Sequence, residues 1–199
     1  MTQGIHLIWT TYGTWLPGDR RGHWSPLFDL YGSIREQGGK LNIPDSETVA
    51  RVSSQMTEPP KWLTPEEIAV VADELGKLVT PPNPPAWAAT IEANHVHLLV
   101  GPMTENISRY TGRLKGRTSS EIGALPTNSD RERVWTSGYW KVFLFDEIAV
   151  QAVKRYIDAH NTRRGLPAKP YPWITPYLAA GLPAVSNRQQ RTAGKPAAK

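Results

Sequence analysis

Apolar residues occur along this chain in short strand-like runs and in helix-like stripes, which polar, glycine-rich and proline-rich segments separate. Residues 5–11 are rich in β-branched and aromatic side chains and run into a turn with two glycines and a proline, so we predict a first strand there. Residues 87–92 and 95–100 are predicted to be two strands of a hairpin, and residues 140–145 a fourth strand.

Three other segments carry the signals of helices. Residues 64–79 begin with a threonine cap, a proline and two glutamates, and they end before a proline-rich stretch that cannot continue a helix. A second helix is predicted from a cap at Asn106 or Ser108 to about residue 123. A third is predicted from a cap at Asp146 to about residue 160.

The order of elements is strand, helix, strand, strand, helix, strand, helix, which is the split βαβ order of ferredoxin-like, or RRM-like, proteins. We therefore predict an α+β fold in which an antiparallel sheet carries helices on one face and has an added C-terminal helix. Residues 1–178 are predicted to be a single domain, in which residues 18–60 form an irregular insertion with one short helix. Residues 179–199 are predicted to be a flexible basic tail.

The composition of the chain is that of an ordinary soluble globular protein, with 39% hydrophobic and 21% charged residues among 199. It has no cysteine, which excludes disulfides and thiolate metal sites. Its longest apolar run is far shorter than the roughly 20 residues that span a bilayer. We predict no membrane span and a cytoplasmic location.

The formal net charge of +5 favours a polyanionic partner, although four of these charges lie in the tail. A second basic cluster occurs on the predicted second helix, where few acidic residues accompany it. Its members are Arg109, Arg113, Lys115 and Arg117. They are predicted to bind DNA phosphates, and a solvated helix face is the alternative explanation.

Two histidines mark the strand at residues 95–100. Because side chains alternate along a strand, His95 and His97 project to one face, while Val96 and Leu98 project to the other. We expect one face of this strand to be buried and the other polar. Two imidazoles so placed can bind a single metal ion, but two hydrogen-bonded structural histidines give the same pattern.

The third helix carries a tyrosine beside its apolar stripe. Val150, Val153 and Ile157 form the stripe, and Tyr156 falls about 60° to one side of it at 100° per residue. His160 follows Tyr156 by one turn and shares its face. On the helix alone, a half-buried structural tyrosine is the favoured explanation of the pattern, ahead of a catalytic one.

Taken together, these motifs resemble a known family. Residues 92–100 (EANHVHLLV) look like the His-hydrophobic-His motif of single-tyrosine HUH transposases, which include the REP-associated tyrosine transposases. Residues 135–140 (WTSGYW) and 154–160 (KRYIDAH) are similar to the aromatic strand and the nucleophile helix of that family.

The resemblance implies specific roles for these residues. Tyr156 would be the nucleophile, and His95 and His97 would bind a divalent metal, Mg²⁺ or Mn²⁺. The third ligand falls at His160, where the family commonly has Gln or Asn, and Asn161 is the alternative. The implied reaction cleaves and rejoins single-stranded, hairpin-forming DNA through a covalent 5′-phosphotyrosine, and a homodimer is a further possibility that relatives suggest.

Two other functions compete with this one. The chain can be a domesticated relative that binds nucleic acid on its sheet without cutting it, or a metal-dependent phosphoesterase in which water is the nucleophile. The presence of His95, His97, Tyr156 and His160 argues against the first.

Overall fold

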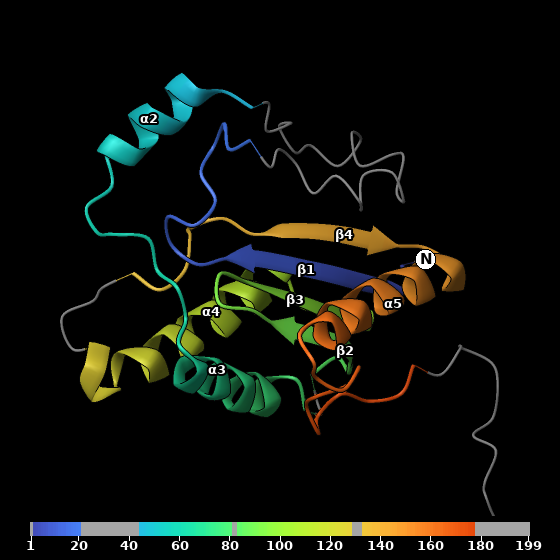
Figure 1. Ribbon diagram of the computed structural model, residues 1–199. Coiled ribbons are helices and arrows are strands. Elements are labelled where there is room, and N and C mark those ends of the chain that lie inside the picture. The colour runs from blue at the N-terminus through green and yellow to red at the C-terminus, as the bar shows by residue number, and fades with distance from the viewer. Residues whose placement is uncertain (1, 21–43, 81–82, 129–132, 178–199) are drawn as a thin grey trace, which may run out of the picture.

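A single antiparallel sheet organises the chain. The computed structural model describes residues 2–20, 44–80, 83–128 and 133–177 (Figure 1). Its strands are β1 (Gly4–Thr10), β2 (Ala86–Ile91), β3 (His95–Val100) and β4 (Trp140–Leu144). They lie in the order β2-β3-β1-β4, and every neighbouring pair is antiparallel. This is the ferredoxin-like strand order, and it confirms the predicted α+β fold class.

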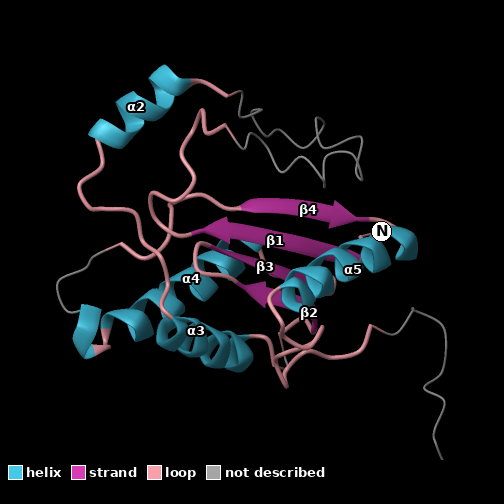
Figure 2. Cartoon of the chain, viewed as in Figure 1, coloured by secondary structure: helices cyan, strands magenta, loops and turns pink. Residues whose placement is uncertain are grey.

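Helices follow the strands as predicted (Figure 2). The helices are α2 (Ser46–Ser54), α3 (Pro65–Leu78), α4 (Ile107–Gly123) and α5 (Glu147–Arg163), and a short 3-10 turn, η2 (Pro126–Asn128), follows α4. α2 is the one short helix expected in the insertion, of which residues 21–43 lie outside the described residues. The predicted tail, residues 179–199, also lies outside them, and the assignment of a single domain stays a prediction.

Side-chain caps fix where the three main helices begin. Thr64 and Glu67 form a capping box at the start of α3, in which each side chain accepts a hydrogen bond from the other residue's backbone N–H. The cap of α4 is Asn106 rather than Ser108, and its side chain accepts from two backbone amides. Asp146 caps α5 by accepting from the amide of Ala149. Local sequence therefore determines where these three helices begin.

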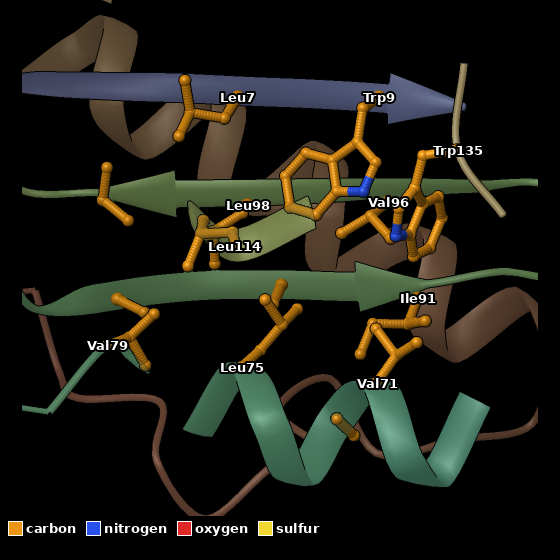
Figure 3. Packing of buried hydrophobic residues seen from close by; sticks show 14 of the residues in the cluster. Leu7, Trp9, Val71, Leu75, Val79, Ile91, Val96, Leu98, Leu114 and Trp135 are labelled. Atoms are coloured by element: carbon orange, nitrogen blue, oxygen red, sulfur yellow. The ribbon is translucent and has the colours of Figure 1, made fainter. Parts of the chain in front are cut away.

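The larger core lies between the sheet and the pair α3 and α4 (Figure 3). Alternate residues of β1 and β3, including Trp9 and Leu98, project into it. They meet Leu75 of α3 and Leu114 of α4, and all four of these side chains are buried.

A second core lies on the other face of the sheet, under α5. Val150, Val153 and Ile157 form the predicted stripe of α5, and they pack against residues such as Leu99 and Val142. Every residue of β3 is buried as a result. The prediction of a polar face on this strand was wrong, because a strand is only half-exposed when nothing covers its second face.

The free edge of β2 is covered by the segment that follows α5. The amide of Thr175 donates to the carbonyl of Ala86 at 2.8 Å, and the indole N–H of Trp173 donates to the carbonyl of Ala72 in α3 at 3.0 Å. This segment ties the two layers of helices together around one edge of the sheet.

Within the described residues, no helix is both long and apolar enough to cross a membrane. The cellular location of the protein stays a prediction.

Candidate active site

β3 and α5 bring three histidines and a tyrosine together on the face of the sheet that α5 covers. His95 and His97 project from β3 toward this face, as strand alternation predicts, and Tyr156 and His160 descend from α5. β3 and α5 are about 50 residues apart in the chain, so only the tertiary fold makes them neighbours.

The distances within this group are short. The ligand nitrogens of His95, His97 and His160 all lie within 4.8 Å of one another. The ring of Tyr156 lies 4.6 Å from the ring of His160 and 5.5 Å from that of His97, between centroids. A metal ion held at about 2.0–2.1 Å by each nitrogen requires the ligand atoms to be roughly 3.4 Å apart in a tetrahedral arrangement, so a bound ion would draw the rings closer together.

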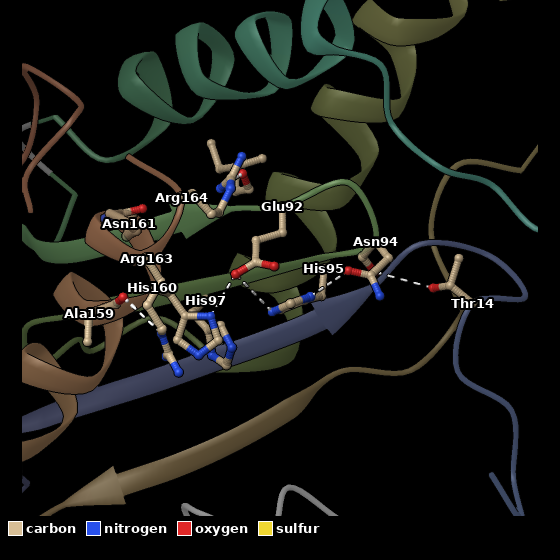
Figure 4. A network of polar contacts seen from close by, with 12 residues as sticks. Thr14, Glu92, Asn94, His95, His97, Ala159, His160, Asn161, Arg163 and Arg164 are labelled. Atoms are coloured by element: carbon tan, nitrogen blue, oxygen red, sulfur yellow. Dashed lines mark hydrogen bonds and ion pairs between the residues drawn. The ribbon is translucent and has the colours of Figure 1, made fainter. Parts of the chain in front are cut away.

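Each histidine of this cluster is held through its Nδ1 atom, and Figure 4 shows the contacts of His95 with Asn94 and of His160 with Glu92. Nδ1 of His95 lies 2.8 Å from Oδ1 of Asn94, and Nδ1 of His160 lies 2.6 Å from Oε1 of Glu92. Nδ1 of His97 lies 3.0 Å from Nε2 of a fourth histidine, His6. A metal would therefore be bound through Nε2 of each ring.

Glu92 lies between two of these rings. Its Oε1 atom is 3.8 Å from Nε2 of His95 as well as 2.6 Å from Nδ1 of His160. Burial opposes ionisation of this carboxyl, but the hydrogen bond with His160 and the charges of His95, His160 and Arg164 outweigh it, so the pKa of Glu92 is lowered. At neutral pH an anionic side chain thus orients the third predicted ligand.

His97 and His6 are fully buried. Burial, reinforced by the charge of His160, lowers the pKa of His6 to about 3. Burial also lowers the pKa of His97 well below its ordinary value, and the neighbouring histidines add to the effect. Both are neutral imidazoles at physiological pH, which is the form that binds metals.

This burial predicts that acid destabilises the protein. Below pH 6.5 the unfolded chain binds protons at these two histidines while the folded protein does not, so stability is complete above pH 6.5 and declines toward the lowered pKa. For His6 we expect a loss of about 1.6 kcal/mol between pH 6.5 and pH 5, and His97 should add a loss in the same direction. Urea unfolding at a series of pH values measures it, and a flat profile over this range would contradict it. His6→Leu should show the shallower slope.

Tyr156 is half-buried, as expected for a residue beside the apolar stripe. Burial raises the pKa of its hydroxyl; Arg163 lowers it and Glu92 raises it further. The side chain is therefore protonated at neutral pH. Lys154, its neighbour in sequence, is engaged with Asp158 one turn later and does not serve the tyrosine.

The side-chain amide nitrogen of Asn161, the alternative third ligand, is engaged in hydrogen bonds outside the histidine cluster. Its side chain is fully buried, and its amide donates to the carbonyl of Ala89 at 2.9 Å and to that of Ala168 at 3.0 Å. It joins the end of α5 to β2. The ligand atoms of His95, His97 and His160 converge, so His160 stays the proposed third ligand.

The basic residues of α4 lie in the other layer, because α4 packs on the opposite face of the sheet. Arg113 donates to Glu105 at 2.8 Å, and Arg117 donates to Glu74 of α3 at 3.0 Å. Arg109 is exposed. The sequence shows few acids on this helix, but the fold supplies them from other segments. A DNA-binding role for these residues stays a prediction.

Lys115 has a different environment from the arginines. Its Nζ atom donates to the carbonyl oxygens of Thr136 at 2.5 Å, Gly138 at 2.8 Å and Ser137 at 3.3 Å. Burial lowers its pKa to about 8. Its three protons are directed at the turn before β4, which it holds against α4.

The aromatic residues near β4 divide between core and surface. Trp135 is buried, meets Trp9 edge-to-face and donates to Thr118 at 3.0 Å. Tyr139 is partly exposed, and its hydroxyl lies 2.8 Å from that of Ser108. The residue that sequence reasoning missed is His6. A single polar residue within an apolar strand was the sequence feature that could have identified it.

Comparison with known proteins gives one match to a family. Residues 85–160 match the family described as "Transposase IS200 like". The match begins at β2 and ends at His160, so it includes the three histidines and Tyr156. No curated protein matches the chain.

Two solved structures are similar to the chain at low identity. A Deinococcus radiodurans protein described as a candidate transposase is 16% identical over 80% of this chain and 91% of its own, with a TM-score of 0.38. A REP-associated tyrosine transposase bound to a REP hairpin is 9% identical over 94% of this chain and 95% of its own, with a TM-score of 0.41.

Proposed function

We propose that the chain, in which residues 85–160 match the family described as "Transposase IS200 like", cleaves and rejoins single-stranded DNA with Tyr156 as nucleophile. One observation carries the proposal: Tyr156 and His160 of α5 meet His95 and His97 of β3 within one cluster. Packing of a structural tyrosine would not require three neighbouring histidines that are each oriented by a contact at Nδ1.

The residues of the cluster fit a divalent metal. His95, His97 and His160 would hold it through Nε2, because Nδ1 of each ring is engaged. When bound, such an ion polarises a phosphate oxygen and offsets the charge that develops there. Of the two predicted ions, Mn²⁺ suits imidazole ligands better than Mg²⁺, which prefers oxygen. We therefore propose Mn²⁺ ahead of Mg²⁺.

The proposed cleavage step uses the tyrosine hydroxyl. The Oη atom of Tyr156 forms a bond to phosphorus while the bond from phosphorus to the 3′ oxygen breaks. The tyrosine loses its proton, and the departing 3′ oxygen gains one. The product is a 5′-phosphotyrosine that keeps the energy of the phosphodiester, so a second 3′-hydroxyl can reverse the step and join a new strand.

The environment of Tyr156 sets a requirement for this step. Burial holds the pKa of its hydroxyl above the ordinary value, so ionisation needs favourable charge nearby when substrate is bound. Lys154 is engaged with Asp158, and we assign it no part in activating the hydroxyl. Glu92 has an indirect effect on Tyr156. Its carboxylate orients His160, whose ring lies next to that of the tyrosine.

The proposed substrate is a single strand that folds into a hairpin, as the sequence resemblance implies. A homodimer also stays a prediction, since relatives include enzymes that assemble each site from two chains. Neither follows from the arrangement of the described residues.

An adduct assay tests the function. The protein is incubated with Mn²⁺ or Mg²⁺ and with end-labelled single strands that tile the DNA flanking its gene, first across imperfect palindromes. We expect a protein–DNA band on a denaturing gel that carries the label from the 3′ end of the strand. Binding without a band or cleavage would support the domesticated binding module. Cleavage without a band would support a phosphoesterase that uses water.

The basic residues of α4 are predicted to bind DNA phosphates, and Arg109 tests this prediction better than Arg113 does. Arg109 is exposed, whereas Arg113 already pairs with Glu105. We expect Arg109→Ala to weaken DNA binding and to reduce the slope of log affinity against log salt by about 1. Arg113→Ala should have a smaller effect on both. Fluorescence anisotropy between 50 and 300 mM salt measures them, with Arg51→Ala on α2 as the control. An unchanged slope in both variants would show that these two residues of α4 do not contact DNA phosphates.

A further inference from the structure

Each of the three histidines in the cluster has one partner residue at its Nδ1 atom, and one of these three partners differs in kind from the other two. Asn94 and Glu92 offer side-chain oxygens to His95 and His160. His97 instead meets the nitrogen of another histidine, His6. An oxygen of an amide or a carboxylate can only accept, whereas a neutral imidazole nitrogen accepts or donates according to its tautomer.

His6 is placed for this contact by the sheet. It lies in the middle of β1, opposite Leu99 of β3 and Val142 of β4, on the face that α5 covers. Its Nε2 atom lies 3.0 Å from Nδ1 of His97, and the two rings stack with centroids 5.1 Å apart at 27°. His6 is fully buried, so a packing residue alone would be apolar at this position.

The direction of this hydrogen bond determines what His97 can do. A metal on Nε2 of His97 requires that atom to be free of a proton, and a neutral imidazole then carries its one proton on Nδ1. That proton must be donated to Nε2 of His6. The opposite direction places a proton on Nε2 of His97, which blocks the ligand atom.

We propose that His6 is a positioning residue of the histidine cluster: it accepts the hydrogen bond from Nδ1 of His97 and so presents Nε2 of His97 to the metal. This inference rests on the proposed metal-dependent function. It requires His6 to carry its own proton on Nδ1, an atom that is buried and has no hydrogen-bond partner among the described residues.

Metal affinity separates this role from simple packing. Titration of the whole protein with Mn²⁺ at pH 7.5, followed by the EPR signal of free Mn²⁺, gives the Kd of each variant. We expect His6→Leu, which removes the acceptor, to weaken binding about 10- to 100-fold. His6→Gln keeps an acceptor at similar reach and should restore most of the loss.

The matched control is Val142→Ala, which truncates a buried neighbour of His6 across the β1–β4 pair. We expect it to lower the melting temperature without changing the Kd for Mn²⁺ more than about twofold, because it removes packing but no hydrogen bond. A Kd for His6→Leu within threefold of the wild type, while the wild type binds Mn²⁺, would overturn the inference and leave the proposed function standing. A wild type that binds no Mn²⁺ or Zn²⁺ would overturn both.

A spectroscopic measurement on the wild type covers the case in which His6→Leu does not fold. With Zn²⁺ bound, ¹⁵N long-range NMR of the five histidines reports which ring nitrogen carries each proton. We expect protons on Nδ1 of both His97 and His6. A proton on Nε2 of His6 would contradict the inference, because His6 would then donate to His97.

Discussion

Tyr156→Phe is expected to abolish the covalent protein–DNA adduct and to lower cleavage at least about 10³-fold, the scale on which enzymes lose activity with their nucleophile. The change removes one oxygen and keeps the ring that packs against His97 and His160. Affinity for Mn²⁺ and for single-stranded DNA should stay within about twofold, because neither interaction needs a hydroxyl in the ground state. A denaturing gel with end-labelled DNA measures the adduct.

The matched control is Tyr171→Phe. Tyr171 is also partly buried, its ring stacks on that of Trp173 at 5.1 Å, and burial raises its pKa as it does that of Tyr156. It lies outside the histidine cluster, so its adduct yield should match the wild type. Cleavage that survives in Tyr156→Phe without an adduct would assign the attack to water. An adduct that survives in Tyr156→Phe would place the nucleophile on another residue.

His97→Ala is expected to lower metal affinity by at least about 100-fold and to eliminate metal-dependent cleavage. It should also destabilise the fold by about 2–4 kcal/mol, because it opens a cavity and leaves Nε2 of His6 without its partner. His97 is fully buried. The substitution therefore affects the fold as well as the proposed metal site.

His95→Ala separates the two effects. His95 lies at the start of β3, retains some exposure, and has its Nδ1 contact with the adjacent Asn94. We expect a comparable loss of metal affinity with less than about 1 kcal/mol of destabilisation. Calorimetric titration with Mn²⁺ and urea unfolding of both variants measure the two quantities. Wild-type metal affinity in both variants would indicate that the cluster is structural and that its buried histidines only provide hydrogen-bond partners for one another.

Local sequence determined the elements of this protein and half of its site. Strand alternation placed His95 and His97 on one face, and helical spacing placed Tyr156 beside His160. The caps at Thr64 and Asp146 marked helix starts correctly. These features depend on residues within about one turn or one strand of each other, so a sequence window contains the physics that sets them.

The tertiary structure decided what each of these faces meets. It put α5 over the histidine face of β3, which turned a predicted polar face into a buried one. It brought His6 to His97, which is 91 residues away, and it gave the side-chain amide nitrogen of Asn161 two carbonyl acceptors.

The same is true of the basic residues of α4. Glu74 and Glu105 reach Arg117 and Arg113 from α3 and from the loop before α4. Charge counted along one helix omitted them, because electrostatic partners are neighbours in space. Periodicity and capping are therefore fixed by the local chain, whereas burial, tautomer and charge pairing depend on packing between remote segments, which only the folded protein supplies.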